Sequence, residues 1–531
     1  MSSSRNIGLQ SFFLSFFVFF GICIFYYILS ISKTDGQYVY PLDDAYIHLA
    51  IAKNFALHDV WGITRYGFSS TSSSPLFTFM ISFLIQVFGN HDQIPLYFNI
   101  TFALGIVYFL SMYYGETFRN VRNTVLATLV TLFFAVLHLQ VLSGMEHVFQ
   151  VFLFIVNIYS FSNWNKSRMA VPAFYLSLIL MGLVRFESMF YFVILAGVLI
   201  TVKKWKNALG VLIAGFVPVL LFCYFNYQQD GYFFPNSVVV KGTQLTLGPE
   251  MFVRLKTIFL DHLFLNKSFY KIGIFPILIS TVFICRDTIR NKSLKEVIIK
   301  NFFLIVFSLL MICHAMFADL KGMFRYEAYI LTGFCMAIIP RISALFSDYK
   351  SYIKGEKLIT ILVIMNILLL FYKSWFADRI LENGGKNIYE QQIQSARFLH
   401  TYYNTSKVVA NDIGAISYYT DIHLLDIVGL GSVEMIPFTA DKRNLDEEFE
   451  NFLIQYTTNN KYEIAVIYDE WFQGHIPRNW KKIAVLKIKN MIAVSKDEVS
   501  IYALEQTNPE TLRRNIRDFK WNKNVEVRIV D

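Results

Sequence analysis

Two adjacent acidic residues open the first polar stretch of the chain. Asp43 and Asp44 follow a long apolar run and precede a helix-like stretch at 45–57. Like charges side by side raise each other's pKa unless a cation, a metal ion or a proton relay compensates. The simplest interpretation is a helix cap, because Asp is a common N-cap residue. The alternative is catalytic, with either carboxylate serving as a general base.

Charged and polar side chains also occupy the turns between later apolar segments. Ionisable groups at membrane depth are costly and suggest a functional site, although a single one is often a snorkelling or loop-solvated charge. Here carboxylates and cations fall on one predicted side, which is the composition of a site for a phosphorylated, hydroxyl-rich substrate. The candidate catalytic residues are Asp43 and Asp44, and the candidate substrate-binding residues are Ser74, Glu146, Arg185, Glu187, Asn236, Lys241, Arg325 and Tyr326.

The composition requires a lipid environment for much of the chain. Of its 531 residues, 55% are hydrophobic and 16% are charged, and a soluble protein of this length could not bury so much apolar surface. The net charge of +9 does not indicate nucleic-acid binding. Residues 376–531 carry 19 Lys and Arg against 22 Asp and Glu, so the positive excess lies in the apolar part. There it clusters in short loops, as the positive-inside rule describes.

Twelve apolar segments precede residue 376, and eleven are predicted to span the membrane. The segment 76–88 is too short and lacks a basic flank, so an interfacial or re-entrant helix is expected there. Short basic loops such as 286–300 then fall on one side, which places the N-terminus in the cytoplasm and the C-terminus outside. The outward loops include 33–93 and 227–270. The predicted spans are 11–31, 94–114, 124–142, 148–161, 169–184, 188–202, 208–226, 271–285, 301–317, 328–345 and 358–375.

The chain changes character after residue 375. A transmembrane domain over 1–375 is predicted to be followed by a soluble, extracytoplasmic α/β domain over 376–531. Short β-branched runs predict its strands, and amphipathic patterns predict its helices. The predicted strands are 407–411, 463–468, 483–488 and 491–494, and the predicted helices are 388–403 and 445–457.

The outward motifs and their order resemble the GT-C superfamily of membrane glycosyltransferases, in particular its arabinofuranosyltransferase and mannosyltransferase-like branch. The resemblance covers residues 1–432, and the common order of motifs that are weak singly carries it. The matching motifs are Asp43-Asp44-Ala45-Tyr46-Ile47, Ala52-Lys53-Asn54, Ser73-Ser74-Pro75-Leu76-Phe77, Ser143-Gly144-Met145-Glu146, Arg185-Phe186-Glu187, Gly231-Tyr232-Phe233-Phe234-Pro235-Asn236-Ser237 with Lys241, Arg325-Tyr326, and Asp412-Ile413-Gly414-Ala415-Ile416-Ser417-Tyr418-Tyr419.

The resemblance implies inverting transfer of a sugar from a polyprenyl-phosphate donor to a glycan, lipid or protein acceptor. The reaction would take place on the outer face of a bacterial cytoplasmic membrane. Asp43 or Asp44 would accept the proton of the attacking hydroxyl. Glu146 would position the acceptor or join Asp44 on a divalent metal such as Mg or Mn, which some members of the superfamily need and others do not. The departing phosphate would be held by Arg185, Lys241 and Arg325.

Two other classes of function fit parts of the sequence. A secondary transporter or lipid flippase would also place charges among interrupted helices. Against it, the sequence shows no paired halves with matched interruptions, and the charged turns fall on one face. A structural protein of the cell envelope would account for the apolar segments but for none of the charged turns.

Overall fold

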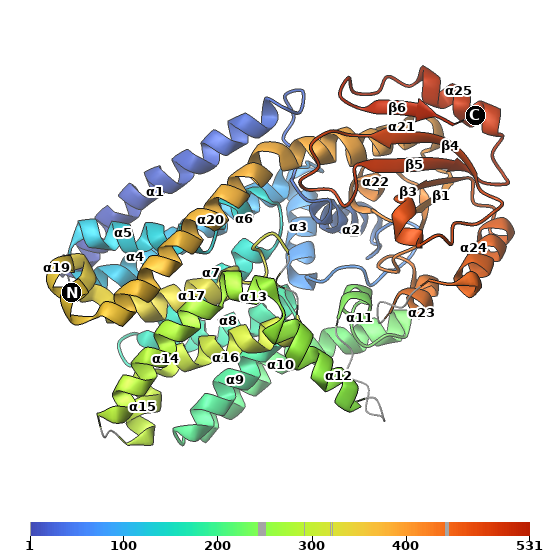
Figure 1. Ribbon diagram of the computed structural model, residues 1–531. Helices are drawn as coiled ribbons and strands as arrows, with labels where there is room; N and C mark the ends of the chain where they lie inside the picture. Colours follow the sequence, from blue (N-terminus) through green and yellow to red (C-terminus); the bar gives the residue numbers. More distant parts are fainter. Residues whose placement is uncertain are drawn as a thin grey trace.

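The computed structural model describes residues 2–242, 251–290, 293–318, 320, 322–440 and 445–530. Helices form an elongated bundle at one end of the molecule, and a small sheet with its own helices forms the other end (Figure 1). Residues 243–250 of the predicted outward loop 227–270 lie outside the described residues, as do residues 291–292 of the basic loop 286–300.

Within the described residues, five helical stretches are long and apolar enough to cross a membrane, and two bent pairs bring the number to at most seven. The chain is therefore a multi-pass membrane protein. The five stretches are α1 (Ser2–Ile31), α4 (Ile94–Phe118), α10 (Trp205–Asp230), α17 with α18 (Ala328–Ile338 and Ser343–Ser347), and α20 with α21 (Lys357–Ile388 and Gln394–Tyr403). The bent pairs join α12 (Met251–Thr257) and α13 (Lys267–Ile272) to α14 (Ile274–Ile289), and α15 (Leu294–Lys300) to α16 (Phe302–Phe317).

Shorter apolar helices account for the remaining predicted spans. Each of the eleven predicted segments coincides with one or more helices, but the number that cross the membrane stays a prediction. One segment is interrupted at Val136, whose φ of +54° ends one helix and starts another. The shorter helices are α3 (Pro75–Phe88), α5 (Val121–Phe134), α6 (Leu137–Leu142), α7 (His147–Ser162), α8 (Ala170–Val184), α9 (Ser188–Thr201), α11 (Asn236–Lys241) and α19 (Tyr349–Gly355).

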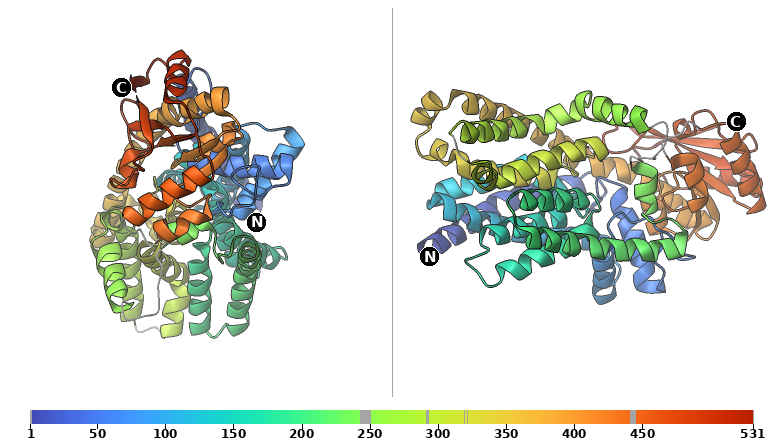
Figure 2. Two further views of the ribbon diagram at one scale, coloured as in Figure 1. Left: turned by 90° about the vertical axis from the view of Figure 1, so that its right-hand side faces the viewer. Right: turned by 90° about the horizontal axis from the view of Figure 1, so that it is seen from below.

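The first outward loop contains two helices. The stretch predicted at 45–57 is α2 (Asp44–His58), and α3 begins at Pro75, a residue whose fixed φ suits the first turn. The loop helices run across the direction of the long helices (Figure 2). This orientation agrees with the expected interfacial helix at 76–88, although its depth in a membrane stays a prediction.

A six-stranded mixed sheet forms the centre of the C-terminal region. Its strand order is β2-β1-β3-β5-β4-β6, with β1 parallel to β2 and β3 and the other pairs antiparallel. The strands are β1 (Lys407–Ala410), β2 (His423–Asp426), β3 (Ile464–Ile467), β4 (Lys481–Lys487), β5 (Glu498–Ala503) and β6 (Glu526–Ile529). The helices that follow α21 are α22 (Gly414–Tyr419), α23 (Ile436–Thr439), α24 (Glu447–Asn459) and α25 (Pro509–Asp518).

The prediction of a strand at 491–494 is wrong. These residues form no strand, because the side chain of Asn387 on α20 accepts the backbone N–H of Ile492 at 2.9 Å and holds the segment against that helix. The sheet is completed instead by β5, a few residues later. The strands predicted at 407–411, 463–468 and 483–488 correspond to β1, β3 and β4.

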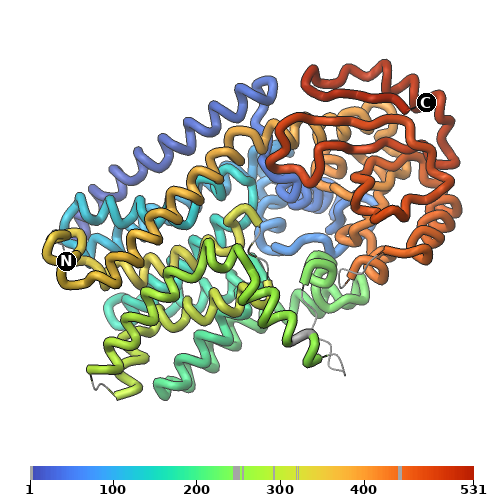
Figure 3. The backbone as a smooth tube through the Cα atoms, viewed as in Figure 1, coloured from blue at the N-terminus to red at the C-terminus, as the bar shows by residue number. Residues whose placement is uncertain are grey.

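A continuous helical rod connects the two ends of the molecule. α20 crosses the predicted boundary at 375/376 without a break and continues through a π-helical turn (Tyr389–Ile393) into α21. The first-loop helix α2 packs against α22 of the sheet region, and Figure 3 shows this early, blue part of the trace beside the orange C-terminal part. The first loop is therefore held between the bundle and the sheet.

Candidate active site

A cavity of about 490 Å³ lies where the first loop, the bundle and the C-terminal region meet. We call it the central cavity. Six of the predicted site residues line it, whereas Asp43, Ser74, Glu146 and Asn236 do not. The six are Asp44, Arg185, Glu187, Lys241, Arg325 and Tyr326. Turns separated by almost 300 residues in the sequence thus contribute to one site.

Asp44 forms an ion pair with Arg325 at the wall of the cavity. Nη2 of Arg325 donates to Oδ2 of Asp44 at 2.8 Å, and the Asp44 side chain keeps a third of its surface exposed. Burial would raise the pKa of Asp44, but Arg325 and Lys241 hold that pKa well below its usual range. The carboxylate is therefore ionised and able to accept a proton.

Arg325 has unused hydrogen-bonding capacity beside this ion pair. Its Nη2 also donates to the Tyr326 hydroxyl at 3.1 Å, yet its buried Nε and Nη1 have no hydrogen-bond partner among the described residues. Met323 and Phe324, just before it, both adopt left-handed φ values of +54° and +61°. Non-glycine residues rarely adopt this conformation, so the turn is strained where it presents the guanidinium.

A second guanidinium group lies on the same aromatic ring. Arg185 and Arg325 lie 5.1 Å and 5.0 Å from the centre of the Tyr326 ring. Two like charges come this close because each is neutralised by a carboxylate and is attracted to the electron-rich ring. Tyr326 therefore joins the two cationic parts of the site.

Arg185 is held in place by two carboxylates. Its Nη1 donates to Oε1 of Glu146 at 2.8 Å and its Nε to Oε2 of Glu187 at 3.0 Å. Glu146 is fully buried behind the cavity wall. Burial alone would raise the pKa of Glu146, but two histidines and Arg185 lower it to about 2. Glu146 is thus a counter-ion that orients Arg185, and Glu187 is the partner that faces the cavity.

Three polar residues of the first loop, His48, Thr71 and Ser73, line the cavity but were not among the predicted site residues. His48 accepts or donates a hydrogen bond with Thr78 at 2.8 Å and lies 3.5 Å from Glu146. Ser73 accepts from Nη1 of Arg185 at 3.3 Å. His48 stands four residues after Asp44, so both fall on one face of α2, and this spacing was a signal for it.

Asp43 faces away from the cavity and docks the C-terminal region. Its carboxylate accepts the backbone N–H groups of Gly414 at 2.6 Å and Ala415 at 2.8 Å. Asp412 lies against the same carboxylate, and burial together with Asp43 raises the pKa of Asp412 well above its usual range. Ionising both carboxyl groups at once is therefore unfavourable. The place occupied by Asp43 leaves no room for a Cβ on Gly414.

Three further motif residues are buried without lining the central cavity, namely Asn236, Ser74 and Lys53. The Asn236 side chain donates to the carbonyl of Leu430 at 3.2 Å, which links α11 to the C-terminal region. Ser74 is the N-cap position of α3. Lys53 donates to the carbonyl of Tyr418 at 2.7 Å, so this motif residue fastens α2 to the end of α22.

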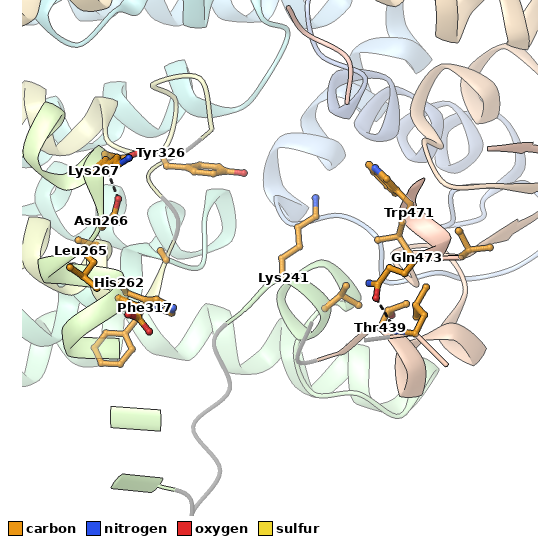
Figure 4. A pocket seen from close by; sticks show the side chains of 18 residues that line it. Lys241, His262, Leu265, Asn266, Lys267, Phe317, Tyr326, Thr439, Trp471 and Gln473 are labelled. Atoms are coloured by element: carbon orange, nitrogen blue, oxygen red, sulfur yellow. Dashed lines mark hydrogen bonds between the residues drawn. The ribbon is translucent and has the colours of Figure 1, made fainter. Parts of the chain in front are cut away.

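Lys241 ends α11 and borders two hollows. It lines the central cavity and also a larger hollow of about 700 Å³, which we call the outer chamber. In Figure 4 its side chain extends between Tyr326 on one side and Trp471 on the other. No ion pair fixes its amine within the part of the chain that the structure describes.

The hypothesis of a metal held by Asp44 and Glu146 does not fit the arrangement of these side chains. Asp44 is paired with Arg325, whereas Glu146 is paired with Arg185 and lies behind the wall. Across the described ranges, no group of three His, Cys, Asp or Glu residues is placed to hold an ion. We therefore derive no step through a metal.

Comparisons with known proteins identify the architecture. Residues 386–502 match the profile of a domain of unknown function (DUF8728), and no curated protein matches the sequence. ArnT from Cupriavidus metallidurans in the apo state is similar over 92% of this chain and 97% of its own, with 12% identity and a TM-score of 0.53. The same protein bound to undecaprenyl phosphate is similar over 93% of this chain and 98% of its own, with 11% identity and a TM-score of 0.52.

A weaker likeness extends to the Archaeoglobus fulgidus oligosaccharyltransferase tethered to an acceptor peptide. It covers 92% of this chain and 74% of the other, with 11% identity and a TM-score of 0.42. The assignment rests on ArnT, whose full length is matched. The resemblance drawn from the sequence motifs is confirmed for the architecture: this chain has the GT-C fold.

Proposed function

We propose that this protein is an inverting membrane glycosyltransferase that moves a sugar from a polyprenyl-phosphate donor to an acceptor hydroxyl. The observation that carries the proposal is the ion pair of Asp44 and Arg325 at the wall of the central cavity. A carboxylate able to take a proton and a cation with unused donors, both facing one space, are the two groups that this reaction needs.

The cationic side of the cavity suits the phosphate of the donor. Arg325 and Lys241 both line the cavity, and Nε and Nη1 of Arg325 have no hydrogen-bond partner within the part of the chain that the structure describes. Charge-assisted hydrogen bonds to phosphate are about twice as strong as neutral ones. A phosphate that accepts hydrogen bonds from these side chains would remove the free-energy cost of leaving donors of Arg325 unpaired in the wall.

An apolar wall of the cavity suits the lipid part of the donor. Four apolar side chains from the turn before α9, from α9 itself and from α11 line this side: Phe186, Met189, Phe190 and Val238. An isoprenoid chain against these side chains would bury apolar surface, which stabilises binding by about 25 cal/mol per Å². The carrier named in one ArnT structure, undecaprenyl phosphate, has this combination of an anionic head and an apolar tail.

The reaction proceeds by direct displacement at the anomeric carbon. The acceptor oxygen forms the new glycosidic bond while the bond from the anomeric carbon to the phosphate oxygen breaks. The hydroxyl proton passes to Asp44, and the electron pair leaves with the polyprenyl phosphate. Arg325 and Lys241 stabilise the charge that develops on the departing oxygen. One inversion at the carbon follows from a single displacement.

Donor binding makes Asp44 a better base. With Arg325 as its main partner, the Asp44 carboxylate has a low pKa and little affinity for a proton. A phosphate that accepts from Arg325 brings negative charge close to Asp44 and shares its cation, so the pKa of Asp44 rises. The base is thus strengthened only when the donor is in place.

The proposed orientation places the site at the outer surface of a bacterial cytoplasmic membrane. The turns that build the central cavity are those predicted to face outward, and the short basic loops are predicted to face inward. The C-terminal region would then be periplasmic or extracellular. A polyprenyl donor explains why the site lies at the end of the bundle, since its tail stays in the bilayer.

Binding of the lipid carrier tests this function. The full chain in nanodiscs should bind undecaprenyl phosphate, and undecaprenol, which lacks the phosphate, at least tenfold more weakly. Native membranes that contain labelled polyprenyl-phosphate sugars should yield a labelled product and free polyprenyl phosphate. Equal affinity for the two lipids, together with no product, would contradict the proposal.

A further inference from the structure

The outer chamber is a second, more polar hollow next to the central cavity. It has a volume of about 700 Å³, within the roughly 300–1,000 Å³ of small-molecule sites. The two hollows share the lining residues Lys241, Phe317, Ala318 and Tyr326. A molecule in the outer chamber would therefore contact side chains that also line the central cavity.

The walls of the chamber come from both ends of the molecule. One wall is formed around the start of α13 and the other by the C-terminal region, including Trp471 and Gln473 (Figure 4). Trp471 is half-buried, with its ring 5.4 Å from that of Tyr468 on one side. The rest of its surface lines the chamber as an aromatic platform.

Hydrogen-bond donors lie on both walls of the chamber, with Gln473 on the same wall as Trp471 and Asn266 on the opposite wall (Figure 4). The side-chain oxygen of Gln473 accepts the backbone N–H of Leu445 at 3.3 Å, and that of Asn266 accepts from Ser268 at 2.9 Å. Because both oxygens are occupied, the amide nitrogens are the atoms left to donate. The indole N–H of Trp471 also has no partner among the described residues. Hydroxyl and ring oxygens of a sugar can accept from all three.

We propose that the outer chamber binds the acceptor and that the acceptor is a saccharide. A pyranose or furanose ring presents apolar C–H faces to an aromatic ring and oxygens around its edge, which matches an aromatic face at Trp471 with N–H donors on its own wall and on the wall opposite. The inference rests on the proposed function, because it names the acceptor class for the same reaction.

A peptide acceptor fits this chamber less well. Extended peptides are commonly bound along an open sheet edge through backbone hydrogen bonds. The edge strands of this sheet are β2 and β6, and neither contributes a residue to the lining of the chamber. The described part of the lining offers side-chain donors and an aromatic face instead.

Ligand-observed NMR on the full chain in nanodiscs tests the proposal. Maltotriose, mannotriose and chitotriose are the saccharide probes, and a set of soluble hexapeptides is the competitor class. We expect saturation transfer to at least one trisaccharide, weakened about tenfold by Trp471→Ala, the upper range for an aromatic stacking contact. Trp471→Phe, which keeps an aromatic face, should retain most of the signal.

Two controls separate this proposal from the proposed function. Trp205→Ala alters an exposed tryptophan at the start of α10 and should leave the saccharide signal unchanged. Undecaprenyl phosphate binding should be the same in the wild type and in Trp471→Ala. The inference is overturned if only peptides give a Trp471-dependent signal, or if no trisaccharide does. Loss of carrier binding in the wild type would instead contradict the proposed function.

Discussion

The carboxylate of Asp43 accepts the backbone N–H of Gly414 at 2.6 Å, and this contact fastens the first loop to the C-terminal region. Asp44, the next residue, faces the central cavity and pairs with Arg325. Successive residues on a helix point about 100° apart, so the two carboxylates face different parts of the molecule. Asp43 positions the C-terminal region, and Asp44 is the base that we propose.

Asp43→Asn should loosen this docking. The amide keeps one acceptor oxygen and loses the charge, which corresponds to about 1.5–3 kcal/mol for a hydrogen bond to a charged group. Hydrogen exchange at the peptide that contains Gly414 and Ala415 should become at least tenfold faster. Gly414→Ala should do the same, because its Cβ would meet the backbone oxygen of Asp43.

Asp518→Asn is the matched control for this docking. Asp518 ends α25 and is exposed, so the change should leave exchange at residues 414–415 unaltered. Unchanged exchange in Asp43→Asn and Gly414→Ala would show that the contact does not hold the two parts together.

The docking should weaken as the pH rises. Burial and the neighbouring Asp43 raise the pKa of Asp412 in the folded state above the unfolded value of about 3.9. A raised pKa gives stability that is full below the unfolded pKa and is lost as the pH rises through the folded pKa. The protection of residues 414–415, measured as exchange relative to the intrinsic rate at each pH, should therefore fall toward alkaline pH.

Asp412→Asn should remove this pH dependence, because the amide resembles the protonated acid and can still donate to Asp43. Gln392 and Tyr468, which contact Asp412, are retained in the variant. A pH profile identical to that of the wild type would assign the dependence to other groups.

Arg325→Ala and Lys241→Ala should each lower kcat/KM. The corresponding loss of transition-state stabilisation is about 2–4 kcal/mol, the range for removing one donor to a developing charge. The free energy of unfolding should change little for Lys241→Ala, since this side chain is exposed. Steady-state transfer and thermal unfolding check both expectations. Lys206→Ala, at the exposed start of α10, is the control. Normal turnover in both variants would return these cations to the role of solvated loop charges.

Much of this arrangement followed from the sequence, because apolar segments, basic loops and turn motifs are local patterns. The structure brings six of the residues named from the sequence to the central cavity, and their part in a reaction stays a prediction. Which member of the Asp43–Asp44 pair faces the cavity depends on how α2 packs on α22, and spacing cannot show that. The same holds for Ser73 and Ser74, where the helix start decides which hydroxyl faces Arg185.

Glu146 shows another limit of the sequence. Its motif suggested a substrate-binding or metal-binding carboxylate, but tertiary packing pairs it with Arg185 behind the wall. Asp412 belongs to a motif that the sequence revealed, yet its contact with Asp43 spans most of the chain. The prediction of a strand at 491–494 was wrong because Asn387, which is remote in sequence, accepts a backbone hydrogen bond from that segment.

The topology predicts that a reporter fused after residue 531 is active outside the cytoplasm and that reporters at residues 119 and 205 are active inside. The reason is the one-sided distribution of basic loops. Paired alkaline phosphatase and fluorescent protein fusions measure this directly. Because Asp43 contacts Gly414, the first loop and the C-terminal region lie on one side of the membrane. A cytoplasmic C-terminus would therefore place the whole site in the cytoplasm and would contradict the account.

Turnover of Asp44→Asn tests the central claim most directly. Asn has nearly the shape of Asp, and the N-cap position of α2 is Asp43, so the change leaves the start of the helix intact and a purely structural role predicts near-normal activity. Loss of the general base predicts a fall of about 10²–10⁴-fold in single-turnover transfer, with binding of undecaprenyl phosphate retained. Asp59→Asn, at the exposed far end of the same helix, should transfer normally. Wild-type rates of transfer in Asp44→Asn would contradict the account.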